Sequence, residues 1–410
     1  MPKDNFKKIA VWNSAFLGDA ILTLPLLQSL RLNYPEARID FYTRRGFSGL
    51  FSAHPALDAV YEYDKASAGK SPAATLAYGR DLAARGYDLW ISAHRSLRSA
   101  MLARSSGARV RIGYDSPSFL GLNRLFYTRR VPRRFAELQE VERLLELLRP
   151  LDLPQISTWP DLALPEAALA GARNFFAALE AFAPGAGAGG PRPVLGLHPG
   201  SVWGTKRWPV EYFAETGLRA LRAGAQLLLF AGPGEEGMAA DVFSRLCEGL
   251  HAELAPEAED AALAALLRAV PGGAPVMKAG PEATRVFRLR GAGAGQTEAM
   301  AGGPACVNLA GALNLPELAA FIGRLSCYVS NDSGPMHMAW PQRVPLVALF
   351  GPTVPGLGFA PRGENSILLE TDLDCRPCGL HGPQSCPKGH HDCMRRLNPD
   401  LVWPEVKRRL

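Results

Sequence analysis

In the first half of the chain, short apolar runs alternate with longer stretches in which apolar and polar residues mix at helical spacing. The runs predict buried strands at 8–12, 38–42, 59–63 and 88–92. The stretches between them predict helices over 20–32, 47–54 and 74–85, followed by a longer helix over 134–148. Strands and helices that alternate in this way predict a parallel sheet with helices on both faces.

The same alternation begins again after residue 193. Strands are predicted at 194–198, 226–230, 327–330 and 345–350, and helices over 209–223, from 235, over 316–325 and over 335–340. The Ala-, Gly- and Pro-rich segment 182–193, FAPGAGAGGPRP, suits neither element and predicts a linker. The predicted organisation is therefore an N-terminal lobe 1–181, a linker 182–193, a C-terminal lobe 194–397 and a closing helix 398–410.

This organisation is an α/β fold with two doubly wound lobes and a cleft between them. Ligands of such sheets bind beyond the carboxyl ends of the strands, so we expect the catalytic and binding residues in the loops at those ends. Periodicity weakens between residues 252 and 305, where Ala, Gly and Pro dominate. We expect some helix over 260–270 and interpret the segment as a surface insertion without chemistry.

Composition places the protein among globular chains. It has 410 residues, 47% hydrophobic and 20% charged, which excludes a wholly disordered chain. No apolar run approaches the roughly 18 residues of a membrane-spanning helix, and Asn13 and Asp19 interrupt the apolar residues after the N-terminal lysines. We therefore expect no transmembrane segment, no secretory leader and a cytoplasmic location.

The net charge of +6 is mild, but its distribution is uneven. Between Trp90 and Pro150 there are 12 arginines and 5 acidic residues. This excess predicts a basic face that suits an anionic partner, although a generally arginine-rich surface would give the same count.

The first predicted strand leads into a loop that ends in Gly18 and Asp19, at the start of a helix. An aspartate there can cap the helix, or it can be a catalytic carboxylate presented by the end of the strand. A dinucleotide-binding loop would instead carry G-x-G-x-x-G. Its absence argues against a nicotinamide-dependent dehydrogenase.

In the second half, the segment HPGSVWGTKRWP follows a strand and precedes a helix. The hydroxyl of Ser201 and the ammonium of Lys206 near a helix start predict an anion site, although the spacing is not that of a Walker loop. The next strand runs into AGPGEE, which puts Glu235 at a helix start. That carboxylate can contact a ligand or simply complement the helix dipole.

The segment VSNDSGPMHMAW, residues 329–340, carries the most chemistry. Asp332, Ser333 and Gly334 follow a strand, and His337 comes within the first turn of the next helix. Backbone N–H groups at that helix start suit a diphosphate. A lone histidine is usually structural, but His337 is within one turn of this anion site. Another tight loop, Gly351-Pro352-Thr353, follows the next strand.

Taken together, these segments resemble glycosyltransferase family 9, and within it the lipopolysaccharide heptosyltransferases II. The stretches that carry the resemblance occur in the family's order: NSAFLGDAILTLPLLQSL, SLRSA…RIGYD, LHPGSVWGTKRWP, FAGPGEE, VSNDSGPMHMA and ALFGPT. The resemblance covers nearly the whole chain. It implies a GT-B fold, two Rossmann-like lobes with the acceptor on the N-terminal lobe and ADP-heptose on the C-terminal lobe. It also implies that the closing helix crosses back onto the N-terminal lobe, as in GT-B chains generally.

The resemblance also implies roles for individual residues. Asp19 matches the catalytic base. The donor-binding positions match Ser201 and Lys206 in the phosphate loop, Glu235 as a ribose contact, and Asp332, Ser333, Gly334 and His337 in the sugar and diphosphate site. The chain departs from the family in its long 252–305 segment and in Trp340-Pro341, which replace small residues after the histidine and put the floor of the donor site in doubt.

Four of the seven cysteines fall within nineteen residues: Cys375, Cys378, Cys386 and Cys393. Four soft ligands suit a structural Zn²⁺ ion, although the spacing lacks a paired CxxC knuckle. Two disulfides are less compatible with a reducing compartment, and a loop with free thiols is the remaining alternative.

The resulting hypothesis is an inverting glycosyltransferase that moves a heptose from ADP-heptose to the lipid A-linked inner core of lipopolysaccharide. It requires no cofactor, works at the inner-membrane surface as a peripheral protein, and has no nucleic-acid partner. Two alternatives stay open: a non-catalytic protein that binds sugar nucleotides, and a family 9 transferase with a different sugar or acceptor.

Overall fold

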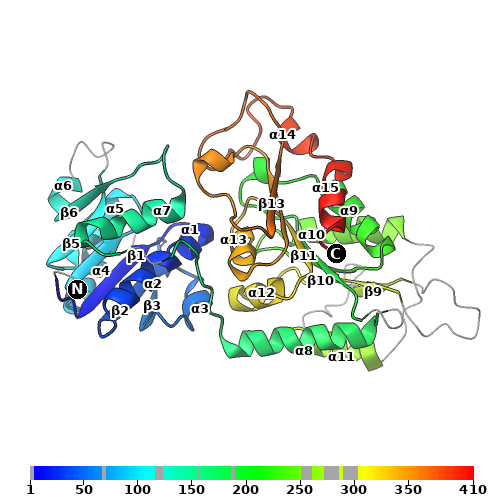
Figure 1. The fold of residues 1–410 in the computed structure, drawn as a ribbon, viewed down its shortest axis with the longest axis horizontal. Helices are drawn as coiled ribbons and strands as arrows, with labels where there is room; N and C mark the ends of the chain where they lie inside the picture. Colours follow the sequence, from blue (N-terminus) through cyan, green and yellow to red (C-terminus); the bar gives the residue numbers. More distant parts are fainter. Residues whose placement is uncertain are drawn as a thin grey trace, which may run out of the picture. The chain divides into compact units, whose positions relative to one another are not determined.

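The computed structural model describes residues 4–66, 71–115, 123–154, 157–185, 190–250, 261–271, 286–289 and 303–410. The chain divides into two compact units (Figure 1). Unit 1 comprises residues 1–165 and 356–359, and unit 2 comprises residues 166–355 and 360–410.

Unit 1 is built on a parallel sheet with the strand order β3-β2-β1-β4-β5-β6 among its described residues. This is the order of a Rossmann sheet. The first three strands extend to one side of β1, and the later strands are added on its other side, beginning with β4. The strands are β1 Lys8–Asn13, β2 Arg38–Arg44, β3 Ala59–Tyr63, β4 Leu89–Ser92, β5 Val110–Asp115 and β6 Arg129–Pro132. The helices are α1 Leu17–Leu22, α2 Leu24–Asn33, α3 Ser48–Phe51, α4 Pro72–Ala84, α5 Leu97–Ser105, α6 Asn123–Phe126, α7 Glu140–Leu145 and the 3₁₀ turn η2 Glu146–Leu151.

Unit 2 repeats this plan with the order β13-β12-β11-β7-β8-β10-β9, in which only β9 is antiparallel among the described strands. The strands are β7 Val194–His198, β8 Gln226–Leu229, β9 Val286–Arg288, β10 Ala305–Asn308, β11 Cys327–Asn331, β12 Leu346–Phe350 and β13 Ser366–Glu370. The helices are α8 Glu166–Phe182, α9 Val210–Arg222, α10 Glu236–Gly249, α11 Ala261–Ala269, α12 Leu315–Ile322, α13 Met336–Ala339, α14 Asp392–Arg395 and α15 Pro399–Lys407, with 3₁₀ turns η4 Gly204–Lys206, η6 Trp340–Gln342 and η7 Pro355–Leu357.

The central strands are buried on both faces, which explains why they are continuous apolar runs in the sequence. Every residue of β7, β11 and β12 is buried. In unit 1, one face of the sheet carries a cluster of aromatic rings around Trp12, which stacks on Tyr42 and Trp90 with ring centroids 5.7 and 5.8 Å apart. The two-lobed α/β class predicted from the sequence is thereby confirmed.

The boundary between the units differs from the predicted linker. Helix α8 belongs to unit 2, so the boundary lies at residue 165 and not at 182. The reason is packing: Phe175 on α8 lies against Phe321 on α12, with ring centroids 4.8 Å apart. The segment 182–193 follows α8 inside unit 2, and its residues 186–189 lie outside the described part of the chain.

Four further expectations differ from the structure. The helix predicted over 134–148 begins only at Glu140, and the one over 20–32 is divided at Thr23. The closing helix α15 packs in unit 2 beside α9 (Figure 1), and its Val402 and Val406 join the core of that unit. In the 252–305 segment, α11 confirms the helix expected over 260–270, but the described part is more than a surface insertion, because α11 packs on α8 and β9 extends the sheet. The rest of that segment lies outside the described residues.

A glycine in the centre of the unit 2 sheet offers a test of this packing. A Cβ atom at Gly196 on β7 would lie 2.4 Å from Cδ1 of Leu325 and 3.0 Å from the rings of Phe230 and Tyr328. We expect Gly196→Ala to lower the free energy of unfolding by about 1–3 kcal/mol, as overpacking does in well-packed cores.

Urea denaturation of the purified variants would measure the effect. Gly237→Ala is the matched control, because no atom lies within 4 Å of a Cβ at Gly237 on α10, and helical Ala is favoured over Gly by about 0.5–1 kcal/mol. Equal stabilities for the two variants would contradict the packing described here.

Candidate functional site

Each sheet has one point where the strand order reverses, between β1 and β4 in unit 1 and between β7 and β11 in unit 2. Such points are where parallel α/β sheets bind ligands. Asp19 follows β1, and the segments with Ser201 and Lys206 and with Asp332 and His337 follow β7 and β11. The predicted residues therefore fall at the topological switch points of the two sheets.

Asp19 is held in place by its own loop. It is the third residue of α1, and its Oδ2 accepts a hydrogen bond from the N–H of the N-cap residue Phe16 at 3.2 Å. Its backbone carbonyl accepts from Nδ2 of Asn13 at 3.1 Å and from Oγ1 of Thr23 at 2.8 Å. Asp19 is thus not the N-cap itself, but its side chain does reach back to cap the helix.

The carboxyl group of Asp19 has an unusual affinity for protons. Burial and the nearby carboxylate of Glu140 raise its pKa to about 7, against the opposing effects of the Phe16 N–H and the Arg133 guanidinium. A carboxylate that titrates near neutral pH is suited to act as a general base, because it can both accept and release a proton under working conditions. A cap alone does not require such a pKa.

Two cationic side chains, Arg133 and Lys65, interact electrostatically with this carboxyl group. Burial, together with the cations Lys65, Arg133 and Arg98, lowers the pKa of His94 to about 4, so that its ring is neutral. His94 follows β4, and its Nδ1 lies 3.2 Å from Oγ of Ser14. The residues whose charges shift these pKa values come from four separate segments of unit 1, so these segments lie close together.

Arg133 and Glu140, whose charges act on Asp19, belong to a buried ionic cluster. Arg133 donates from Nη2 to both carboxylate oxygens of Glu140, at 2.7 and 2.8 Å. Arg143, which is fully buried, donates from Nη1 to the same carboxylate at 2.8 Å and to the carbonyl of Leu357 at 3.0 Å. The N–H of Glu140 in turn donates to the carbonyl of Gly358 at 2.9 Å, so the segment 356–359 is part of unit 1.

The arginine-rich stretch does not form one uniform basic face. Several of its arginines make local bonds, such as Arg129 to Asp4 at 2.8 Å, Arg130 to Asp115 at 3.6 Å and Arg111 to the carbonyl of Phe126 at 2.8 Å. The interactions that shift the pKa values of Asp19 and His94 involve Arg98 and Arg133. The basic character near Asp19 is therefore local.

In unit 2, the structure brings Lys206 and Asp332 together. The Nζ of Lys206 lies 2.5 Å from Oδ2 of Asp332, and the two residues are 8% and 5% exposed. The resemblance assigns the lysine to the phosphate loop and the aspartate to the sugar and diphosphate site, without indicating this pairing. An incoming anion would have to share Lys206 with Asp332.

Thr353 completes this pair and was missed as a site residue, although its loop had been noted. Its Oγ1 donates to Oδ2 of Asp332 at 2.7 Å, and the N–H of Asp332 donates to the carbonyl of Leu349 at 3.1 Å. The position of Thr353, directly after a buried strand, was the signal that could have identified it. We refer to Lys206, Asp332 and Thr353 as the donor triad, after the donor-binding role that the resemblance predicts for the lysine and the aspartate.

His337 lies beside the donor triad. Its ring is buried, and burial together with the Lys206 ammonium lowers its pKa to about 4, although Asp332 acts in the opposite direction. Trp340 donates from Nε1 to Nδ1 of His337 at 3.4 Å. A neutral imidazole that accepts at Nδ1 carries its proton on Nε2. The tryptophan that departs from the family pattern thus fixes the tautomer of His337.

The remaining predicted residues line the same loops. Ser201 is buried, and its carbonyl accepts from Nε of Arg207 at 2.8 Å. The hydroxyl of Ser333 lies 3.3 Å from that of Ser330. The carbonyl of Gly334 accepts the N–H of His337 at 3.0 Å, and α13 has only four residues. The helix whose start is the expected diphosphate site therefore consists of a single turn.

Glu235 lies against His198, with Oε2 and Nε2 3.8 Å apart. Burial would raise the pKa of Glu235, but His198 and the N–H of Gly232 lower it on balance. A Cβ at Gly200 would lie 2.0 Å from Oε2 of Glu235, so only glycine allows this approach. Glu235 is the N-cap residue of α10. The contacts of Glu235 described above do not involve Lys206, Asp332 or Thr353.

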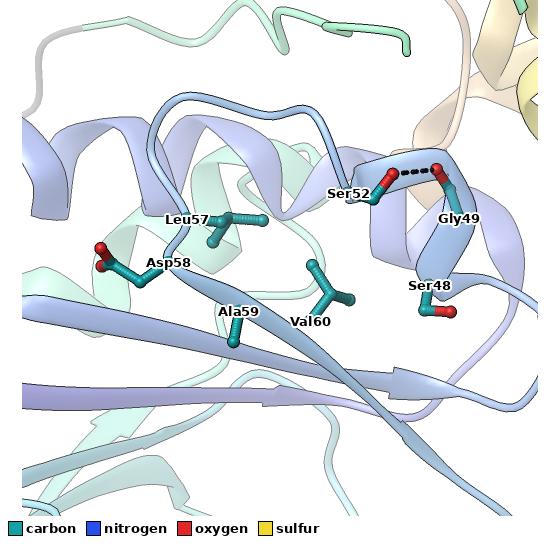
Figure 2. A pocket seen from close by; sticks show the side chains of 7 residues that line it. All are labelled: Ser48, Gly49, Ser52, Leu57, Asp58, Ala59 and Val60. Atoms are coloured by element: carbon teal, nitrogen blue, oxygen red, sulfur yellow. Dashed lines mark hydrogen bonds between the residues drawn. The ribbon is translucent and has the colours of Figure 1, made fainter. Parts of the chain in front are cut away.

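A separate hollow of about 220 Å³ lies beside the edge strand β3 (Figure 2). Ser48, Gly49, Ser52, Leu57, Asp58, Ala59 and Val60 line it. Its polar groups have partners, since Ser48 donates to Glu62 at 2.7 Å and Asp58 accepts from Arg31 at 2.5 Å. Asp19 is not among its lining residues, and we assign it no function.

The four clustered cysteines lie in unit 2, three of them on the loop after β13 and Cys393 on α14, and none forms a disulfide. Burial, with the neighbouring Cys375 and Cys386, raises the pKa of the Cys378 thiol. In the part of the chain that the structure describes, no group of three or more His, Cys, Asp or Glu side chains is arranged to hold a metal ion. The zinc hypothesis therefore stays a prediction from the donor chemistry alone. Nor is any helix of the described ranges long and apolar enough to cross a membrane.

Comparison with known families gives a match over most of the chain. The model of glycosyltransferase family 9 (heptosyltransferase) matches residues 75–272 and 278–384. Lipopolysaccharide heptosyltransferase 1 of Pseudomonas aeruginosa is 28% identical over 98% of this chain and 97% of its own. Lipopolysaccharide heptosyltransferase 2 of Escherichia coli is 27% identical over 97% of each chain. Against the two lipooligosaccharide heptosyltransferases 2 of Campylobacter jejuni, the match spans about half of each relative, 51% and 50%.

Among solved structures, E. coli ADP-heptose lps heptosyltransferase II matches with a TM-score of 0.65 at 23% identity, over 98% of both chains. An E. coli heptosyltransferase solved with ADP matches with a TM-score of 0.63 at 20% identity, over 98% of this chain and 100% of its own. These matches show that the chain has the two-lobed GT-B fold.

The zinc hypothesis leads to a direct measurement. If Cys375, Cys378, Cys386 and Cys393 hold a structural ion, protein purified without added metal contains about one zinc ion per chain. Elemental analysis measures this content, and a thiol titration on the native protein should then find the four cysteines protected. Absence of metal together with seven reactive thiols in the unfolded protein would reduce the cluster to a loop without a metal role.

Proposed function

The chain belongs to glycosyltransferase family 9, the heptosyltransferases, and from this premise we propose that it transfers a heptose from ADP-heptose to the inner core of a lipopolysaccharide. The observation that carries the proposal is Asp19, a carboxyl group with a pKa near 7 at the switch point of one sheet. The donor triad at the switch point of the other sheet supports it. A finer assignment, to the heptosyltransferase II type, rests on the motifs of the sequence.

In the proposed reaction, Asp19 accepts the proton of an acceptor hydroxyl. The hydroxyl oxygen forms a bond to the anomeric carbon of the donor while the bond from that carbon to the diphosphate oxygen breaks. ADP leaves with the electron pair of the broken bond, and the configuration at the anomeric carbon inverts. A positioned general base contributes roughly 10²–10⁴-fold to such a step.

The donor triad supplies the electrostatic part of the reaction. Negative charge accumulates on the diphosphate as the bond breaks, and a fixed ammonium group such as that of Lys206 stabilises that charge. Asp332 and Thr353 hold Lys206 in place before the donor arrives. His337, neutral with its proton on Nε2, is available as a hydrogen-bond donor to a sugar or phosphate oxygen.

The surroundings of Asp19 favour an anionic acceptor. Lys65, Arg98 and Arg133 are the cations whose charges act on Asp19 or His94. A phosphorylated, lipid-linked saccharide presented at the inner-membrane surface has the complementary charge. The protein would then act as a peripheral enzyme of the cytoplasm, without a nucleic-acid partner and without a required cofactor.

A non-catalytic sugar-nucleotide-binding protein is the main alternative. It would gain nothing from a carboxyl group whose buried position and neighbouring Glu140 keep its pKa near neutrality, since an ionised Asp19 weakens the fold. A family 9 transferase with another sugar or acceptor is the second alternative. Trp340 beside His337 is the feature that would allow a different sugar.

We expect Asp19→Asn to bind ADP normally and to lose kcat by roughly 10²-fold or more, because an amide cannot accept the proton. Asn can still accept the Phe16 N–H and keep the helix cap. ADP release in the presence of a truncated inner-core lipid measures turnover. Asp81→Asn, on the exposed side of α4, is the matched control. Turnover of Asp19→Asn within a few-fold of wild type would refute the assignment.

The raised pKa of Asp19 predicts two pH effects of known sign. The wild-type kcat/KM should rise with pH through about 7, as the base ionises. Because the folded-state pKa lies above the unfolded value of 3.8, ionised Asp19 destabilises the protein fully above about pH 7, and this cost is lost progressively as the pH falls from 7 toward 4. Asp19→Asn should therefore melt higher than wild type at pH 8 and by a clearly smaller margin at pH 5. A melting difference independent of pH would contradict the raised pKa.

For the donor triad, we expect Lys206→Ala to weaken ADP binding at least tenfold and to lower the melting temperature, because it leaves the buried Asp332 carboxylate without its cation. The double variant Lys206→Ala with Asp332→Asn removes that uncompensated charge, so it should recover stability but not ADP affinity. Isothermal titration calorimetry and thermal melts measure the two effects. ADP, but not NAD, should stabilise the wild type; stabilisation by NAD alone would refute the transferase.

A further inference from the structure

The segment 374–393, which we call the cysteine loop, contacts two of the three loops that carry the donor triad. One is the loop 201–207 that follows β7 and ends in Lys206, and the other is the loop 351–353 that follows β12 and ends in Thr353. Neither loop is part of a helix of more than three residues or of a strand, so their positions depend on what they contact.

The loop 201–207 is held by a series of hydrogen bonds just before Lys206. The amide of Gln384 bridges two of its residues, accepting from the N–H of Gly204 at 3.1 Å and donating to the carbonyl of Val202 at 3.0 Å. His391 Nε2 lies 2.8 Å from the carbonyl of Thr205, which can only accept, so the ring donates. Thr205 itself donates from Oγ1 to the carbonyl of Pro383 at 2.5 Å.

The approach is close enough to require a glycine. A Cβ atom at Gly204 would lie 2.3 Å from the carbonyl oxygen of Gln384. The ring of Trp203 also stacks on that of His381, with centroids 6.0 Å apart and planes 4° from parallel. Backbone and side chains of the two loops therefore fit each other along three consecutive residues, Trp203, Gly204 and Thr205.

The loop 351–353 is held from the same segment by Arg376. Its guanidinium, 5% exposed and paired with Glu370 at 2.6 Å, donates to the carbonyl of Thr353 at 2.6 Å and also to that of Gly351. The N–H of Cys378 donates to the carbonyl of Pro352 at 2.8 Å. All three residues of this loop thus bond to the cysteine loop through their backbone carbonyls.

We propose that Gln384, His391 and Arg376 are positioning residues for the donor, and that the cysteine loop holds Lys206 and Thr353 on Asp332. The inference rests on the proposed function, since it assigns Lys206 to the diphosphate. A lysine side chain has several rotatable bonds, and a ligand that must order it binds more weakly. The cysteine loop fixes the backbone of the two loops that carry Lys206 and Thr353. This reduces the entropy that the lysine loses when a ligand binds, as residues that support a binding site do.

Gln384 gives the cleanest test, because its side chain is exposed and its removal opens no cavity. We expect Gln384→Ala to weaken ADP binding roughly three- to tenfold, the effect of losing one or two hydrogen bonds. KM for the sugar nucleotide should rise, and the melting temperature should stay within a degree or two of wild type. His391→Ala should act in the same direction. Lys388→Gln, on the same loop, is the control and should bind ADP as wild type does.

A double-mutant cycle with Lys206→Ala shows whether the effect passes through Lys206. In that background, Gln384→Ala should change ADP affinity by less than twofold, since the group it positions is gone. An undiminished effect in that background would overturn the inference, as would wild-type affinity in both Gln384→Ala and His391→Ala. If Lys206→Ala itself leaves ADP affinity unchanged, the proposed function fails as well, and the two failures are thereby distinguished.

Discussion

The buried ion pair between Lys206 and Asp332 is the interaction on which the donor side of this protein depends. Removing two charges from water costs several kcal/mol per ion unless their attraction and further hydrogen bonds compensate. Here Thr353 supplies a hydrogen bond to the same carboxylate oxygen that Lys206 contacts. The pair joins two loops far apart in the sequence, so the position of each loop depends on the other.

The ion pair of Lys206 and Asp332 also affects the protonation of the neighbouring His337. Lys206 and burial together keep the ring of His337 neutral, so the cationic charge available to an anion at this place is carried by the lysine. An arriving diphosphate would take over part of the role that Asp332 plays for Lys206. In the proposed reaction, donor binding would therefore exchange one anionic partner of the lysine for another, and would not introduce an anion to an unpaired cation.

The carboxylates Asp19 and Asp332, one in each unit, have different neighbours. Asp332 has a cation 2.5 Å away, whereas Asp19 is partly buried near another carboxylate, Glu140, and its pKa rises to about 7. These neighbours suit the two carboxylates to different proposed roles. Asp332 supports Lys206 electrostatically, and Asp19 is able to take up a proton.

Much of the fold was predictable because parallel strands buried on both faces leave continuous apolar runs, such as those of β1 and β7. Strand β5 was missed because Arg111 and Asp115 interrupt its run. The helix expected over 134–148 begins late because the N–H of Glu140 bonds to Gly358, a contact across the sequence. The capping box of Gln139 and Glu142 was the local signal for the true start.

The site was predictable only residue by residue. Motifs predicted roles for Asp19, Lys206 and Asp332, because each follows a strand at a loop with recognisable chemistry. They could not show that Lys206 pairs with Asp332 or that Glu140 acts on Asp19, since those contacts depend on how distant loops pack. Gln384 carries no chemical signature in the sequence at all. Its role follows only from two hydrogen bonds to the backbone before Lys206, and local pattern cannot encode such a contact. The supporting shell of a site is therefore the part that sequence reasoning is least able to find.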